Sequence, residues 1–140
     1  MLISLISADE GVMPDALACL AASAALQLSD IPFGEPVAEV RIARIENNWI
    51  VNPSWPELQM ADINLMVAGT HENIIMVEGE MREVSEEEMA EAIRKAHHYI
   101  QKLCENSSKS LQLKPVRNQS AKNATREQGY SSSGIFIPIL

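Results

Sequence analysis

Few side chains in this sequence have the type and spacing that chemistry requires. Its two cysteines, Cys19 and Cys104, are far apart and lack the CxxC spacing of redox or zinc sites. A thiol becomes a good nucleophile when a nearby base or cation lowers its pKa, but Cys19 lies in an apolar stretch with no base beside it. We therefore expect both cysteines to be reduced and buried as small hydrophobic residues, which disfavours an unrelated small α+β enzyme built on Cys19.

The histidines do not form a metal-binding pattern. His97 and His98 are adjacent in a predicted helix, where neighbouring side chains point about 100° apart, whereas two ligands on one helical face need i,i+4 spacing. His71 lies in a predicted turn, and we expect it to be exposed. The sequence therefore predicts no metal site from its histidines.

The elements that must position these groups alternate between strands and helices. Pro14 and Asp15 begin a helix whose Ala, Leu, Cys and Ser residues occupy every face, so we expect it to be central and buried. The predicted elements, in chain order, are a short buried strand at residues 2–7, this helix to residue 28, a hairpin of strands 37–45 and 49–51, a hairpin of strands 63–68 and 74–77, and an outer helix from 85 to about 104.

The outer helix has the clearest pattern. Ser85 and Glu88 form a capping box at its start, and Glu91 and Lys95 form an i,i+4 pair on its polar side. Its apolar stripe consists of Met89, Ile93, Ala96, Ile100 and Leu103. We expect an amphipathic helix with this stripe against the sheet and the other side in solvent.

The first hairpin has a strand with period-two alternation. Val40, Ile42 and Ala38 share one face, whereas Arg41 and its alternating neighbours share the other. The second hairpin also follows the order of a sheet built from consecutive strands. These elements predict an α+β fold with a mixed or antiparallel sheet, one buried helix and one outer helix.

Composition limits the classes of function. The chain has 140 residues, of which 46% are hydrophobic and only 4% aromatic, so one domain with an aliphatic core is expected. Its net charge of −8 makes it a poor ligand for phosphate backbones, and we do not expect this segment alone to bind RNA. The sequence shows no secretory signal and no membrane-spanning run, and its cysteines lack a disulfide framework, which predicts a cytoplasmic protein without a membrane partner.

An ordered set of short motifs resembles the polynucleotide phosphorylase family. The motifs are PDALA at 14–18, ASAAL at 22–26, SDIPF at 29–33, VRIAR at 40–44, NP at 52–53, VAGT at 67–70 and IMVE at 75–78. No single motif is specific, but their order and spacing match the family over roughly the first 105 residues. From this set the chain is identified as a piece of the first of the family's two RNase PH-like domains.

The resemblance implies a fold, a reaction and partners. The implied fold is RNase PH-like, similar to domain 2 of ribosomal protein S5, and the implied enzyme is a phosphorolytic 3′-to-5′ exoribonuclease of RNA degradation. That enzyme uses inorganic phosphate to release nucleoside diphosphates, with Mg²⁺ neutralising charge on the phosphates. RNA, a second RNase PH-like domain and the other subunits of a homotrimer are the implied partners.

The carboxylates that hold the metal ion in the family's second copy are missing here. Counting back from the VAGT strand, the matching positions are Leu58 and Asn64; leucine cannot ligate a hard cation, and asparagine brings no charge. Asp62 and Glu57 lie nearby, and we expect them to be solvated residues rather than ligands. The resemblance thus assigns the segment to the non-catalytic first copy, with no catalytic, cofactor-binding or metal-binding residue and no activity alone. The alternative is a non-enzymatic RNase PH-like scaffold subunit of an RNA-degrading assembly.

Two further features could suggest ligand binding. The serine run at 131–134 resembles the paired serines that hold phosphate in the family's second copy, but no helix pattern follows it, so we interpret it as solvated linker. Trp49 and Trp55 flank a proline-rich corner, where we expect packing in a core or an interface rather than stacking on bases.

Both ends of the chain depart from the family. The family continues before the strand at 2–7, so we expect residues 1–106 to be a partial domain with open strand edges. Residues 107–140 lose both periodicity and resemblance, which predicts an unstructured tail. Codons for 111–117 can be chosen that give a family-like string in another frame. We therefore hypothesise that the tail is a frameshift product, with an authentic disordered extension as the alternative.

Overall fold

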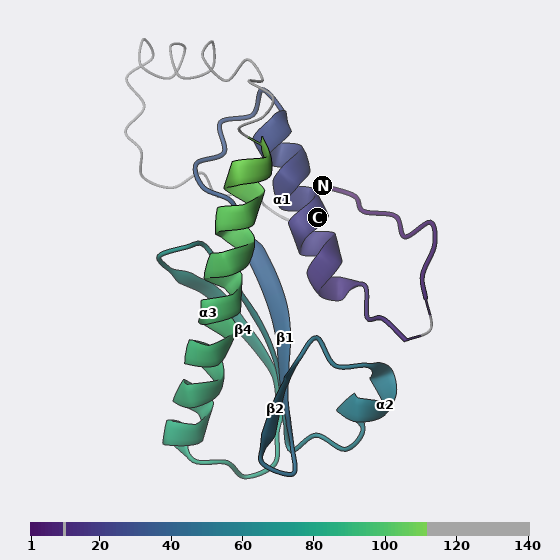
Figure 1. Cartoon of the computed structure of the whole chain (residues 1–140), viewed down its shortest axis with the longest axis vertical. Helices are drawn as coiled ribbons and strands as arrows, with labels where there is room; N and C mark the ends of the chain where they lie inside the picture. The colour runs from purple at the N-terminus through teal and green to yellow at the C-terminus, as the bar shows by residue number, and fades with distance from the viewer. Residues whose placement is uncertain (10, 112–140) are drawn as a thin grey trace.

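The computed structural model describes residues 1–9 and 11–111. Its elements are α1 (Asp15–Leu28), β1 (Ala38–Ile45), β2 (Asn48–Val51), α2 (Trp55–Leu58), β3 (Ile63–Gly69), β4 (Ile74–Met81) and α3 (Glu86–Leu111) (Figure 1). The two predicted hairpins and both long helices are present. The short helix α2 was not predicted, because its four residues carry no periodicity.

The four strands form one sheet in the order β2-β1-β3-β4, and every pair is antiparallel. Of the two predicted sheet types, mixed or antiparallel, the described residues form the antiparallel one, since both hairpins and the β1–β3 contact run antiparallel. The tight turn between β1 and β2 has positive φ at Glu46 and Asn47, 48° and 64°. Two positive φ angles match the right-handed twist of the flanking strands, as in other two-residue hairpins.

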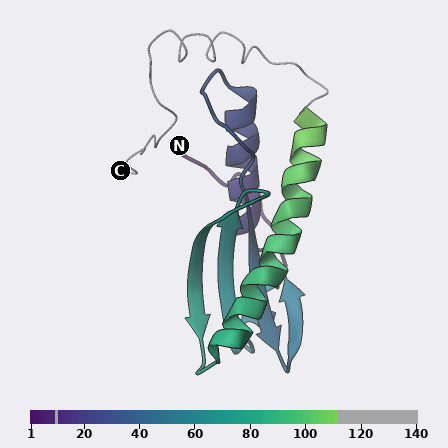
Figure 2. The ribbon, with the colours of Figure 1, turned by 90° about the vertical axis from the view of Figure 1, so that its left-hand side faces the viewer.

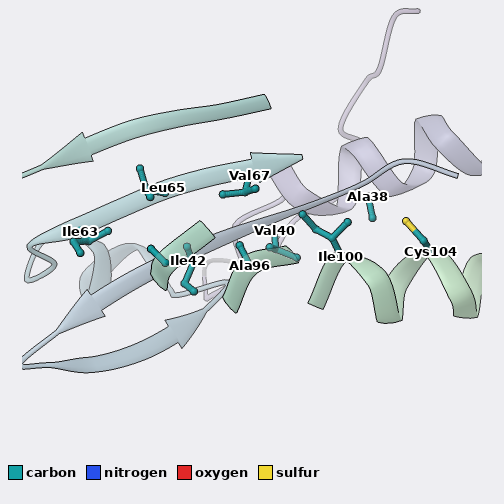
Figure 3. Close-up of a cluster of buried hydrophobic side chains, with 10 residues drawn as sticks. Ala38, Val40, Ile42, Ile63, Leu65, Val67, Ala96, Ile100 and Cys104 are labelled. Carbon is teal, nitrogen blue, oxygen red and sulfur yellow. The ribbon is translucent and has the colours of Figure 1, made fainter. Parts of the chain in front are cut away.

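The core lies between α3 and one face of the sheet (Figures 2 and 3). Its buried members are Ala38, Val40, Ile42, Ile63, Leu65, Val67, Ala92, Ala96, Ile100 and Cys104. The strand alternation predicted for residues 37–45 is confirmed, because the three residues expected on one face all belong to this cluster. Three alanines in the cluster let the backbone of α3 approach the sheet closely.

α3 begins where the sequence predicts and ends later. The amide of Ser85 donates to a carboxylate oxygen of Glu88 at 2.8 Å, and the amide of Glu88 donates to the Ser85 hydroxyl at 3.3 Å, which confirms the capping box. Lys95 and Glu91 form the predicted i,i+4 pair at 3.3 Å. The helix continues to Leu111, so residues 107–111 are helical rather than part of an unstructured tail. Contact with the sheet holds α3, and helix propagation then adds residues without a second nucleation cost. Residues 112–140 lie outside the described part of the chain.

α1 is less buried than its composition predicts. Only Ala16 and Ser23 are buried, and the side chain of Leu17 is 58% exposed. α1 packs beside β1 on the face of the sheet opposite α3 (Figure 2), and the Ser23 hydroxyl accepts a hydrogen bond from the amide of Val37 at 2.9 Å. The prediction of a central, buried helix is wrong here, because β1 and α3 cover α1 only in part and leave Leu17 and Leu28 exposed.

The predicted strand at residues 2–7 is also absent. These residues are exposed and carry no assigned strand. A strand needs a partner strand for its backbone hydrogen bonds, whereas the described residues beside this segment belong to α1 and the sheet consists of β1 to β4. No helix in the described residues combines the length and the apolar character needed to cross a membrane.

Candidate functional site

A pocket of about 500 Å³ opens on the face of the sheet that α3 leaves uncovered. It brings together Leu58 at the end of α2 and Asn64 on β3, the two positions matched to catalytic aspartates. The other lining residues are Met13, Arg41, Trp55, Gln59, Ala61, Asp62, Gly79, Glu80, Met81 and Arg82. The fold therefore places both matched positions in the lining of one pocket.

Arg41 lines this pocket, and its guanidinium is held by two side chains. Its Nη2 lies 2.6 Å and its Nε 3.0 Å from Oδ2 of Asp15, and its Nη1 donates to Oδ1 of Asn64 at 2.8 Å. The side chains of Arg41 and Asp15 are 19% and 27% exposed, so their ion pair is largely shielded from water. Asp15 lies at the first turn of α1 and Asn64 on β3, so Arg41 joins a helix and two strands.

Asp62, a carboxylate that lines the pocket, is ion-paired with Arg44. Arg44, which is 8% exposed, donates to Asp62 from Nε at 3.0 Å and from Nη2 at 2.7 Å, and its Nη1 donates to Glu88 of α3. Hydrogen bonds from Arg44 lower the pKa of Asp62, and hydrogen bonds from the Ser85 amide and from Arg44 lower the pKa of Glu88 to about 2. Asp62 is thus an ion-paired structural residue, not the simply solvated one that the sequence predicts.

Glu57 is also used locally. Its Oε2 accepts hydrogen bonds from the amide and from the hydroxyl of Ser54, each at 2.7 Å. These bonds fix the start of α2 and lower the pKa of Glu57. The carboxylate points to the helix start, so it does not contribute to the pocket as a ligand.

The pocket does not fit a divalent metal ion. Mg²⁺ requires several oxygen ligands, usually with one or two carboxylates among them. Leu58 offers no oxygen, and the amide oxygen of Asn64 is already bound to a cation, Arg41. Within the described residues no group of three or more His, Cys, Asp or Glu side chains could hold a metal ion. We therefore assign no metal ligand in this pocket.

The histidines are placed as their spacing predicts. His71 is exposed, and its Nε2 lies 3.3 Å from a carboxylate oxygen of Glu105. His97 Nε2 lies 3.2 Å from the carbonyl oxygen of Thr70, whereas His98 stacks edge-on against Tyr99. The adjacent histidines thus meet different partners, as helical geometry requires.

The two tryptophans have different surroundings. Trp49 packs against the core, with the guanidinium of Arg44 5.8 Å and Nζ of Lys95 5.9 Å from its ring centre. Trp55 is 58% exposed at the rim of the pocket, so of the two predicted places, a core or an interface, the core is wrong for this residue and an interface stays a prediction. Trp55 lies on the unpredicted helix α2, which carries it outward. The serine run at 131–134 lies outside the described residues.

The cysteines are poor nucleophiles. Cys104 is buried as predicted, and its thiol donates to the carbonyl oxygen of Pro36 at 3.3 Å. Cys19 is half-buried; burial, together with the charge of Glu39, raises the pKa of its thiol to about 12. Burial also raises the pKa of Cys104. These thiols remain protonated at neutral pH, which removes the main argument for a cysteine enzyme.

The residue that sequence reasoning missed is Arg41. Its position on the polar face of a strand was predicted, but its partners, Asp15 and Asn64, are 26 and 23 residues away in sequence. An arginine on a half-buried strand face is itself a signal, because a guanidinium in that place requires a counter-charge. The sequence alone does not identify which carboxylate supplies it.

This chain matches a family model and several known proteins. Residues 35–98, which run from just before β1 into α3, match the family model "3' exoribonuclease family, domain 2". Polyribonucleotide nucleotidyltransferases from Bacteroides fragilis and Porphyromonas gingivalis are 58% and 60% identical over 102 and 100 residues, which is 73% and 71% of this chain. The relative from Cytophaga hutchinsonii is 48% identical over 129 residues, 92% of the chain.

This chain spans only 14% of the length of the first two relatives and 17% of the third. The sheet and α3 correspond to the residues that the family model matches, and the α+β fold with an antiparallel sheet agrees with that match. The chain is therefore homologous to part of polyribonucleotide nucleotidyltransferase and carries the domain 2 region of the 3′ exoribonuclease family.

Proposed function

We propose that this chain represents the first, non-catalytic RNase PH-like copy of a polynucleotide phosphorylase, and that its role is structural. In the assembled enzyme it would pack against the active second copy, contribute to the ring of a homotrimer and line the channel that admits RNA. RNA, inorganic phosphate and Mg²⁺ would then be handled by other parts of the enzyme. The net charge of −8 supports this division, since an acidic segment attracts phosphate backbones poorly.

The observation that carries the proposal is the content of the pocket. Its two matched positions hold Leu58 and Asn64, and Arg41 binds the latter. Of the carboxylates near these positions, Asp62 and Glu57 are already bound to Arg44 and Ser54, which leaves Glu80, the cross-strand partner of Asn64 in the pocket lining. A reaction that depends on carboxylate-bound metal to neutralise phosphate charge finds no carboxylate at either matched position.

The experiment is phosphate-dependent release of nucleoside diphosphate from poly(A) in the presence of Mg²⁺. The purified chain is compared with an intact polyribonucleotide nucleotidyltransferase under the same conditions. We expect no release from the chain while the intact enzyme is active. Release by the chain would overturn the proposal, because it would require a site other than the pocket described above.

The alternative is a scaffold subunit that never takes part in phosphorolysis. A pocket without metal ligands suits that role equally. Mixing the chain with a complete second RNase PH-like copy distinguishes the two. Phosphorolysis that appears or increases on mixing supports the enzyme-derived proposal, whereas stable association with no gain in activity supports the scaffold.

The segment from residue 107 to 140 is a separate hypothesis. Its first residues belong to α3, and we retain the frameshift as the origin of the rest. The match to the Cytophaga hutchinsonii relative counts against a frameshift at residue 107. It covers 129 of the 140 residues, so it must include part of the chain after residue 107. Sequencing the gene tests it. A frame that continues the family after α3 would support a frameshift, and the lack of one would leave an authentic extension.

A further inference from the structure

The pocket contains its own cation. Asp15 and Asn64 direct oxygen atoms at one guanidinium from two sides, at 2.6 and 2.8 Å. Converging carboxylate and amide oxygens are what a hard cation binds in proteins. Arg41 satisfies both oxygens with a charge that is covalently part of β1.

We propose that the Arg41 guanidinium occupies the position in which a metal ion would bind in this pocket. Its positive charge then excludes Mg²⁺, in addition to the effect of the missing carboxylates. The inference rests on the proposed function, which matches Leu58 and Asn64 to metal-binding positions. Restoring two carboxylates would then not restore a metal site. The new carboxylates would pair with Arg41 instead.

The side chain's surroundings explain why it stays in place. Arg41 is 19% exposed and Asp15 is 27% exposed, so the pair is partly withdrawn from water, where charge interactions are stronger than at an open surface. Oδ1 of Asp15 also accepts a hydrogen bond from the amide of Ala16 at 2.9 Å, which holds the carboxylate at the start of α1. The former metal position thereby becomes the anchor between α1 and the sheet.

The test measures Mn²⁺ binding by electron paramagnetic resonance in the full 140-residue chain, without RNA. The double variant Leu58→Asp/Asn64→Asp is compared with the triple variant that adds Arg41→Ser. We expect Mn²⁺ to bind at least about a hundredfold more tightly to the triple variant, because a positive charge a few ångströms from a divalent ion opposes its binding strongly. Equal affinities, or no binding to a folded triple variant, would overturn the proposal.

A matched control adds Arg82→Ser to the same double variant. Arg82 lines the pocket but takes no part in the contact between Asp15 and Asn64. We expect this control to bind Mn²⁺ no more than about threefold better than the double variant, since exposed charges in water interact weakly. A gain as large as that of Arg41→Ser would show that general charge, not the position of Arg41, excludes the ion.

A second measurement needs only chains that keep Arg41. In Asn64→Asp, the new carboxyl replaces an amide oxygen 2.8 Å from the guanidinium, so nuclear magnetic resonance titration should give it a pKa below the ordinary value of about 3.9. A pKa at or above that value would overturn the proposal even if the triple variant fails to fold. These outcomes are independent of the RNA assay. An active unmodified chain refutes the proposed function, whereas an inactive chain with failed metal and titration results refutes only the role of Arg41.

Discussion

Replacing Ile100 with alanine tests which helix builds the core. Ile100 on α3 is fully buried, at 0% exposure, between the helix and the sheet (Figure 3). Leu17 on α1, the helix that composition predicts to be buried, is 58% exposed. The substitutions Ile100→Ala and Leu17→Ala remove three carbon atoms each, so they are matched in chemistry and differ in surroundings.

The expected cost follows from the burial. Removing three buried carbons loses about 2.4 kcal/mol of transfer free energy, at about 0.8 kcal/mol for each methylene. The space left behind adds up to about 2 kcal/mol, depending on how far the sheet and helix collapse into it. We therefore expect Ile100→Ala to lower the free energy of unfolding by about 3 to 4 kcal/mol. For Leu17→Ala we expect a loss of about 1 kcal/mol or less, because more than half of this residue is already in water.

Urea unfolding followed by circular dichroism provides the measurement. For a domain of this size each kilocalorie lowers the melting temperature by about 4 to 8 °C, so Ile100→Ala should also lose more than about 12 °C in a thermal scan. Similar losses in the two variants would refute the assignment of the core to α3 and the sheet. A larger loss in Leu17→Ala would support the buried α1 that composition predicts.

Three further substitutions or treatments have definite expected outcomes. Gly79→Ala should cost more than about 3 kcal/mol in urea unfolding, because its Cβ would lie 2.0 Å from a carbonyl oxygen of β3 and its φ is 153°. In Arg44→Met the free energy of unfolding should fall less steeply as the pH is lowered. In the wild type, Arg44 lowers the pKa of folded Asp62, so Asp62 stabilises the fold above the ordinary carboxyl pKa and this stabilisation is lost as pH falls through the folded pKa. A curve equally steep in wild type and variant would contradict this account. In a Cys104→Ser chain at pH 8, alkylation of Cys19 should be about a thousandfold slower in the folded than in the unfolded state, since its pKa is about 12; rapid modification of the folded chain would show a more acidic thiol.

The contrast between α1 and α3 shows when the spacing of apolar residues predicts which side of a helix is buried. The apolar stripe of α3 was readable because its residues recur at helical spacing, and the structure buries Ala96 and Ile100 from it. The helix of α1 is apolar on every side, which predicts burial only if other elements cover every side. Among the described residues β1 and α3 contact α1 while Leu17 and Leu28 stay exposed, and only the tertiary structure decides which side is covered.

The sequence by itself determined the local features of this protein. It specified the turn at Glu46 and Asn47, the capping box of Ser85 and Glu88, and the absence of a carboxylate at position 58. Each depends on residues within a few positions of one another, where backbone geometry and hydrogen bonding act directly.

Only the tertiary structure decided how the charges are paired. Arg41 reaches Asp15 across 26 residues, and Asp62, at the pocket lining, pairs with Arg44, 18 residues away. These contacts form because a shielded charge must find a counter-charge, but the requirement does not say which one. Strand order brings the partners together, and strand order depends on packing across the whole sheet. The composition of the pocket follows from the sequence, whereas its occupation by Arg41 follows from the fold.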